Sequence, residues 1–214
     1  TDFRQGDVYS FKGESTLVSF FGRANYSYLN RYMITATLRQ DGSSRFGENH
    51  KWGTFPSISL AWRLSDEPFM KRTSSWLDNL KVRLGFGVTG NQNGIGEYKS
   101  LSILSASGAA YYDAATQTWK NAYTQSQNVN PDLKWESTSQ WNFGLDFSIF
   151  NRINGTLELY HKKTSDLLWT YPVPQPPYLV GTMLANVGDL VNKGFELTLG
   201  ANVLRTKDWT LDAN

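Results

Sequence analysis

Three acidic side chains are the residues of this sequence best suited to acid–base chemistry. Asp146, Glu158 and Glu196 each occupy a polar position in a segment where polar and apolar residues alternate. Two carboxylates held close together can hydrolyse a glycosidic bond, one as the acid and the other as base or nucleophile. The sequence does not show that any two of them converge, and acids also fill the interior of water-lined β-barrels. We therefore predict no catalytic residue and no enzyme activity.

Two further patterns that could carry chemistry have weak support. Residues 85–90 match the dinucleotide pattern G-x-G-x-x-G, but that fingerprint needs a helix opening at the glycines, and here the polar run 91–94 follows. His50 and His161 are the only histidines and the chain has no cysteine, so a zinc site lacks ligands. We expect neither a metal site nor a cofactor.

The strands that would position the acids are predicted by a strict alternation of apolar and polar side chains. Apolar residues occupy every second position from 80 to 88, from 141 to 149 and from 195 to 203. A period of two indicates strands with one apolar face and one polar face. We expect strands near residues 15–29, 31–40, 53–64, 79–90, 135–150, 153–169 and 193–205, with an eighth that begins at Trp209.

Composition limits what the two faces can meet. No stretch approaches the roughly 20 consecutive apolar residues of a membrane helix. The mean hydropathy of −0.45 is that of a soluble protein, but the strands of a membrane barrel give the same average because lipid-facing and lumen-facing residues alternate. The net charge of +2 comes from scattered basic residues, which excludes the clustered footprint of a nucleic-acid-binding protein.

The connections between the expected strands alternate in length along the chain. Outer-membrane barrels are built in this way, with short periplasmic turns and long outer loops. The connection 65–78 is longer than the other turns, and we expect a short periplasmic helix there with Ser65 as its N-cap. The short turns are expected at 29–31, 150–152 and 205–208, and the long loops at 41–52, 91–134 and 170–192.

Strand length and aromatic placement also favour a membrane-spanning sheet. The alternating cores are about 9 to 11 residues long, as a tilted strand needs to cross a bilayer, whereas strands of soluble proteins are more often about 5 to 6. Aromatic residues such as Tyr26, Tyr28, Tyr32 and Trp62 gather near strand ends, as in an interfacial girdle. The alternative is a β-sandwich in which the same aromatic residues form an ordinary core.

Several distinctive segments occur in order along nearly the whole chain. They are residues 21–28 (FGRANYSY), 39–46 (RQDGSSRF), 52–57 (WGTFPS), 84–92 (LGFGVTGNQ), 130–136 (NPDLKWE) and 192–196 (NKGFE). Together they resemble the barrel of SusC/RagA-type TonB-dependent transporters. The resemblance implies an all-β, antiparallel transmembrane barrel of about 22 strands with a plugged lumen. Residues 1–214 would form about seven to eight strands of that single barrel domain, and we expect the plug and the remaining strands outside this chain.

The same resemblance implies a function and a set of partners. The protein would import oligosaccharides or oligopeptides across the outer membrane of a Gram-negative bacterium. A SusD-like surface lipoprotein would cover the barrel, and the TonB, ExbB and ExbD complex would supply energy through the missing plug. Outer-membrane lipid would surround the wall, and no nucleic acid is expected. The competing hypothesis is a secreted or surface β-sandwich that binds carbohydrate or acts as an adhesin.

Candidate site residues fall into two groups. Aromatic faces flanked by amides and hydroxyls suit a sugar ring or an extended peptide, so the loop 91–134 is the best candidate for cargo contacts. The alternative is that its aromatic residues pack the loop on itself or on a partner subunit. The predicted outer, substrate-binding residues are Tyr98, Tyr111, Tyr112, Trp119, Tyr123, Asp41 and Arg45. The residues predicted to face the lumen or the plug are Arg39, Arg83, Asp146, Glu158 and Glu196.

Overall fold

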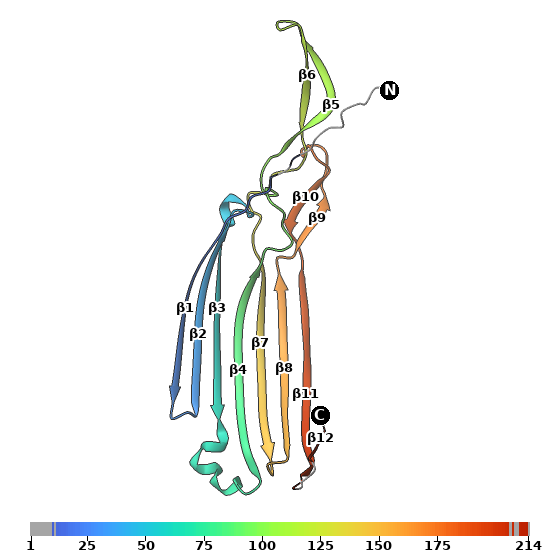
Figure 1. The fold of residues 1–214 in the computed structure, drawn as a ribbon. Helices are drawn as coiled ribbons and strands as arrows, with labels where there is room; N and C mark the ends of the chain where they lie inside the picture. The colour runs from blue at the N-terminus through green and yellow to red at the C-terminus, as the bar shows by residue number, and fades with distance from the viewer. Residues whose placement is uncertain (1–9, 11, 206, 208–209, 214) are drawn as a thin grey trace.

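The long strands of the chain form one curved, single-layer antiparallel sheet (Figure 1). The computed structural model describes residues 10, 12–205, 207 and 210–213. Each long strand pairs with the long strand next to it in sequence, in the order β1-β2-β3-β4-β7-β8-β11-β12. The strands are β1 (Leu17–Tyr28), β2 (Tyr32–Ser43), β3 (Trp52–Arg63), β4 (Leu77–Asn91), β7 (Glu136–Ile149), β8 (Ile153–Ser165), β11 (Asp189–Arg205) and β12 (Thr210–Ala213).

The strand pairing keeps apolar side chains on one face of the sheet and polar side chains on the other. Leu84 pairs with Phe143, Phe143 with Leu159, and Leu159 with Phe195, so one apolar row crosses four strands. The neighbouring row carries Arg83. We call the two sides the apolar face and the polar face. Phe195 is 72% exposed, and the described residues place no second sheet over the apolar face, so the β-sandwich alternative is wrong.

The connections lie at two ends of the sheet, as their lengths predicted. At the turn end, Leu29 and Asn30 both have positive φ, and the Arg31 N–H donates to the Tyr28 carbonyl at 3.0 Å. Positive φ at both central residues suits the twist of a tight hairpin. The expected turn residues Thr206 and Asp208, and the expected strand start at Trp209, lie outside the described residues.

The turn end also carries the expected helical segment, in a different form. Two short 3-10 helices replace a single helix: η2 (Leu64–Asp66) and η3 (Pro68–Thr73). Pro68 disfavours the helical conformation at the preceding residue, and Glu67 accordingly has a ψ of 145°. The prediction that Ser65 caps the helix is wrong, because Arg63 precedes η2 and no side chain caps it. Among the described residues, every helix is too short or too polar to cross a membrane.

The opposite, loop end is more structured than the predicted loops. Two hairpins rise there: β5 (Leu104–Asp113) with β6 (Thr118–Gln125), and β9 (Leu168–Pro172) with β10 (Thr182–Asn186), together with the 3-10 helix η1 (Glu48–His50) (Figure 1). The strand expected over 153–169 ends at Ser165, because Asp166 adopts a φ of 61° and breaks the extended backbone. The strand expected from 193 begins earlier, at Asp189.

A small apolar core ties the loop end together. Its members are Phe46, Phe55, Ile95, Leu133 and Trp135, which come from three separate connections and the start of β3. The Trp135 ring lies 4.4 Å from that of Phe46 and 5.5 Å from that of Phe55, measured between centroids. The Trp135 indole donates a hydrogen bond to the Lys51 carbonyl at 3.1 Å. The core therefore gives the loops a fixed platform on the sheet.

Candidate functional site

An ion network centred on Arg83 occupies the polar face. The Arg83 guanidinium on β4 donates two hydrogen bonds of 2.9 Å to the two carboxylate oxygens of Asp146 on β7. It donates a third, of 2.7 Å, to Glu158 on β8. The Thr156 hydroxyl donates to Asp146 at 3.2 Å. We call these four residues the Arg83 network, and they place three of the predicted lumen-facing residues in direct contact.

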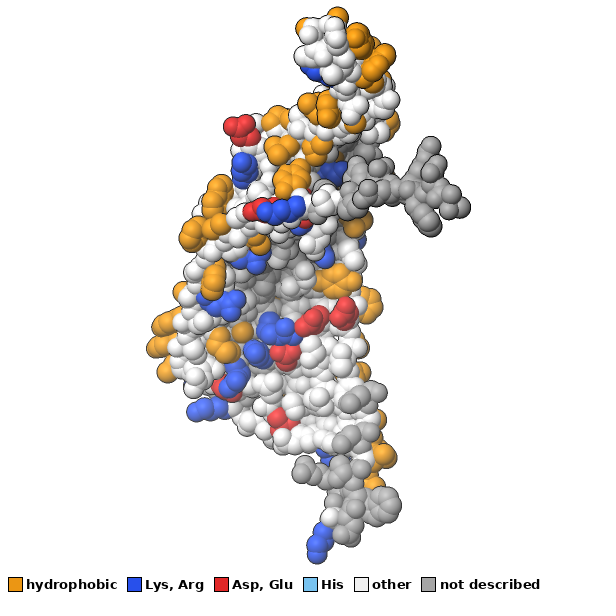
Figure 2. Space-filling model, turned by 45° about the horizontal axis from the view of Figure 1, so that its top comes forward, with side chains coloured by type: hydrophobic (Ala, Val, Ile, Leu, Met, Phe, Trp, Pro, Cys, Tyr) orange, Lys and Arg blue, Asp and Glu red, His pale blue; other side chains and the backbone are white. Residues whose placement is uncertain are grey.

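A glycine makes the geometry of the network possible. Gly144 stands between Arg83 and Glu158 in the strand register, so the guanidinium must cross over it to reach the acid. A Cβ at this position would lie 2.8 Å from the Arg83 Cζ. The absence of a side chain at Gly144 thus lets the arginine lie along the wall. Figure 2 shows basic and acidic side chains side by side in the middle of this face.

The network leaves Glu196 without an ion-pair partner among the described residues. Glu196 on β11 pairs directly opposite Glu158 in the register. Like charges placed opposite each other on neighbouring strands repel. Arg83 forms ion pairs with Asp146 and Glu158, and among the described residues no cation forms one with Glu196. A cationic group from outside these residues would therefore be attracted to this part of the wall.

A trough adjoins the network, and Arg83 and Glu158 belong to the lining of its larger part. Two adjoining hollows of about 260 and 510 Å³ open on the polar face. Gly85 and Gly87 on β4 keep its floor low, and the Gln140 amide donates to Asn142 at 2.8 Å along one wall. Hydroxyl groups line the other wall, from Thr35, Ser57 and Ser59. We call this surface the polar trough.

Three charged residues predicted from sequence lie toward the loop end, where they bind the protein itself. Asp41 is only 4% exposed and forms an ion pair of 2.9 Å with Arg39. The Arg39 guanidinium also lies 5.7 Å from the centre of the Phe55 ring. Arg45 forms an ion pair with Glu97 at 3.0 Å and donates to the Ile95 carbonyl at 3.1 Å. These contacts hold the loops against the apolar core.

The five aromatic residues predicted in the loop 91–134 do not converge on one site. Tyr98 lies near Arg45 beside a hollow of about 420 Å³, where its hydroxyl accepts a hydrogen bond from the Glu14 N–H at 3.1 Å. The other four belong to the β5–β6 hairpin. Tyr112 and Trp119 are cross-strand partners on one of its faces, with centroids 5.5 Å apart. Tyr111 pairs with Lys120 and lies on the opposite face.

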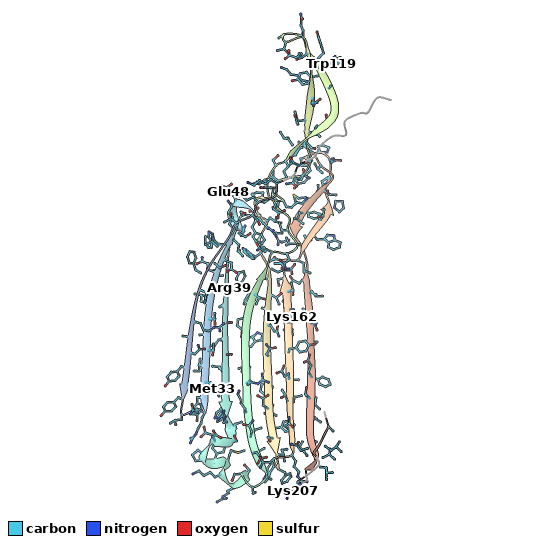
Figure 3. All side chains as sticks on the ribbon, viewed as in Figure 1. Met33, Arg39, Glu48, Trp119, Lys162 and Lys207 are labelled. Carbon is cyan, nitrogen blue, oxygen red and sulfur yellow. The ribbon has the colours of Figure 1, made fainter. Side chains whose placement is uncertain are left out.

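The aromatic face of the hairpin is open. Trp119 is 71% exposed and Tyr123 is 67% exposed, and Figure 3 shows Trp119 near the tip, far from the sheet. Trp119 contacts Tyr112 across the hairpin, but most of the surface of Trp119 and Tyr123 is exposed. Contact with cargo and contact with a partner both remain open for them.

Sequence reasoning missed the residues that fix the second hairpin. The Asn128 amide donates to the carbonyls of Val180 and Thr182 at 2.6 and 2.9 Å. The Asn186 amide donates to the carbonyls of Lys134 and Asp166 at 2.8 and 2.9 Å. Three of these four bonds join residues more than 50 positions apart, so no local sequence pattern could have identified them.

A second missed site lies at the turn end, around Glu67. This carboxylate accepts hydrogen bonds from the Tyr32 hydroxyl and from the Trp62 indole, the latter at 3.1 Å, and lies 3.7 Å from Arg31. The hydrogen bonds from Tyr32 and Trp62, followed by the charge of Arg31, hold the pKa of Glu67 below its usual range against the opposing effect of burial. The contacts attach the helical segment to the aromatic side chains at the strand ends.

The fold and the two faces define a class of protein. An open antiparallel meander with an exposed apolar face and a polar face bearing an ion network is a portion of the wall of a transmembrane β-barrel. The family model for the TonB dependent receptor-like β-barrel matches residues 1–214. The chain belongs to this family, and the SusC/RagA resemblance drawn from its sequence is confirmed.

Relatives and solved structures agree with this assignment. The TonB-dependent receptor SusC of Bacteroides thetaiotaomicron is 42% identical over 207 residues, which are 95% of this chain and 20% of that protein. The TonB-dependent receptor P39 of Formosa agariphila is 38% identical over 201 residues, 92% of this chain and 18% of that protein. The RagAB peptide importer in its "open-open" state is 31% identical, with a TM-score of 0.82 over 92% of this chain and 21% of the matched chain. The chain thus spans about a fifth of the length of these relatives.

Proposed function

We propose that the full protein imports oligosaccharides or oligopeptides across the outer membrane of a Gram-negative bacterium. Residues 1–214 contribute barrel wall and outer loops, and they carry no catalytic group. The observation that supports this most directly is the pairing of an exposed apolar face with a charged polar face in a chain of the TonB-dependent receptor family. One relative is a SusC receptor and one structural neighbour is a peptide transporter, so both cargo classes stay in the proposal.

The polar face is proposed to face the plug and the lumen. Energy from the TonB, ExbB and ExbD complex would act on a plug domain outside these residues. Glu158 and Glu196 stand opposite each other, and among the described residues no cation pairs with Glu196, so a basic side chain of the plug is the group that this acid would attract. Arg39, at the loop end of the same face, would line the lumen above it.

The loop end is proposed to meet cargo and a SusD-like surface lipoprotein. The hollow beside Tyr98 and Arg45 has an aromatic ring, a guanidinium and apolar wall residues, which suits a sugar or peptide segment. Asp41 would hold Arg39 in place beneath it. An isolated two-stranded hairpin is marginally stable in water, so we assign the open face of β5–β6, with Tyr112, Trp119 and Tyr123, to the lipoprotein.

Capture of the full-length protein tests the proposal. The protein is tagged, extracted from outer membranes in detergent and purified, and mass spectrometry identifies what accompanies it. We expect a surface lipoprotein to be recovered, and its ligand then distinguishes glycan from peptide cargo. Recovery of the protein alone, from the soluble or secreted fraction, would contradict the proposal.

A further inference from the structure

The apolar face changes character at the loop end of β7, β8 and β11. From the turn end upward, each row across these strands is apolar as far as Phe143, Leu159 and Phe195. The next row holds Trp141, His161 and Lys193, which are register partners of one another. One row further, Lys163 pairs with Ser139 and Val191. We call Trp141, His161, Lys163 and Lys193 the cationic patch.

The patch presents charge and an exposed indole together. Lys163 and Lys193 are diagonal neighbours on adjacent strands, about 7–8 Å apart at the backbone, so their ammonium groups can approach one anion. Lys163 forms an ion pair with Asp189 at 2.8 Å, and among the described residues Lys193 forms none. Trp141 beside them is 53% exposed. The patch therefore carries one lysine engaged by an acid and one available for a ligand.

The height of the patch matches the headgroup level of a bilayer. Trp141 lies eight positions from Ile149 on β7, which is about 27 Å along the strand and less across the membrane once the strand tilts. Tryptophan at such a level is typical of a membrane interface. Near the β1 edge of the sheet, the same end of the apolar face carries Phe20 stacked on Trp52, 6.2 Å between centroids, in rows whose other described members are Val18, Gln40, Gly42 and Thr54. At this end, the basic side chains on the apolar face of the described long strands thus come from β8 and β11.

Closure of the barrel would leave the patch exposed. Additional strands pair with the edges of a sheet, through backbone hydrogen bonds, and do not cover its face. Apolar rows that face acyl chains lie directly below the patch, which favours a lipid over a protein as its occupant.

We propose that the cationic patch binds the phosphate of the phosphorylated glycolipid that forms the outer leaflet of the outer membrane. The inference rests on the proposed function in one respect, namely that the loop end lies outside the cell. Lys193 is the principal phosphate ligand, Trp141 packs beside the headgroup, and Lys163 contributes when Asp189 does not hold it.

Lipid retention by the full-length protein tests the proposal. Delipidated protein in detergent is mixed with lipid A carrying its phosphates, with dephosphorylated lipid A, or with inorganic phosphate as a competitor, and native mass spectrometry measures the bound fraction. A basic residue at a membrane surface changes anionic lipid binding roughly fivefold. We expect Lys193→Gln to weaken binding of phosphorylated lipid A by about this factor. The double variant that combines Lys193→Gln with Lys163→Gln should bind this lipid more weakly still.

Two variants sharpen the test. Asp189→Asn removes the ion pair that holds Lys163, so it should strengthen lipid binding. If the ion pair served only to stabilise the fold, its loss would not strengthen binding. Lys162 follows His161 in sequence but pairs with Gln140 and Asn192 on the polar face, so Lys162→Gln should leave binding unchanged (Figure 3).

The outcomes separate this inference from the proposed function. Equal binding by the wild-type protein and the double lysine variant, equal binding of the two lipid A forms, or full displacement by millimolar inorganic phosphate would each overturn it. Stronger retention of an inner-leaflet phospholipid than of lipid A would overturn it as well. None of these results depends on cargo or on the lipoprotein, whose capture tests the import function separately.

Discussion

Replacing Gly144 by alanine should break the Arg83 network without any substitution of a charged residue. A Cβ there would lie 2.8 Å from both the Cζ and the Nη2 atoms of Arg83, so the guanidinium must move away from Asp146 and Glu158. Gly85 on the same polar face offers a matched control. The nearest atom to a Cβ at Gly85 is the Asn142 Cβ at 3.8 Å, an ordinary contact.

The magnitude follows from the exposure of the partners. The Arg83 and Asp146 side chains are 36% and 26% exposed, so their pairing is worth more than a surface salt bridge and less than a buried one. A bidentate arginine–carboxylate contact is stronger than a single neutral hydrogen bond. We estimate that displacing the guanidinium lowers the free energy of unfolding by about 1–2 kcal/mol.

A double-mutant cycle isolates this contribution. In the full-length protein in detergent, urea unfolding is measured for Gly144→Ala, for Arg83→Ala and for the pair. Arg83→Ala empties the space above Gly144, so alanine at 144 should then cost little, and the coupling energy should be about 1–2 kcal/mol. Equal losses from Gly144→Ala in the wild-type and Arg83→Ala backgrounds, or an equal loss from Gly85→Ala, would refute the reasoning.

Three other predictions concern the two ends of the sheet. The pKa of Glu67 is lowered on folding, so the stability that this carboxylate contributes is complete above its unfolded pKa of about 4.3 and is lost as the pH falls through the folded value. Glu67→Gln should therefore flatten the acid limb of a profile of unfolding free energy against pH. An unchanged acid limb would contradict this. Gly90→Ala places a Cβ 2.1 Å from the buried Phe55 ring and should cost about 1–3 kcal/mol in urea unfolding, whereas Gly22→Ala, with no atom within 4 Å, should not. Trp119→Ala should leave the unfolding midpoint unchanged but reduce the amount of lipoprotein that is captured with the protein. Tyr111→Ala, on the opposite face of the hairpin, should reduce the captured amount less. Equal capture by both variants would show that the hairpin is not part of the interface.

The faces of the sheet and the places of its turns could be predicted from sequence because they are local properties. Side chains alternate along any strand, so the period of two around Leu84 or Phe195 assigns each residue to a face before any partner strand is known. The polar side that bears Arg83, Asp146, Glu158 and Glu196 followed from that rule. The error at Ser65 arose because Pro68 divides the segment that the cap was expected to start.

The contacts between strands were decided by the tertiary structure. Arg83 lies 63 residues from Asp146 and 75 from Glu158, and only the register that backbone hydrogen bonds impose between strands brings them together over Gly144. The burial of Asp41 and the separation of Tyr98 from Trp119 depend in the same way on how distant connections fold onto one core. Sequence thus determined what each face can offer, whereas strand pairing determined which residues meet, since a slip of one residue would send every side chain of a strand to the other face.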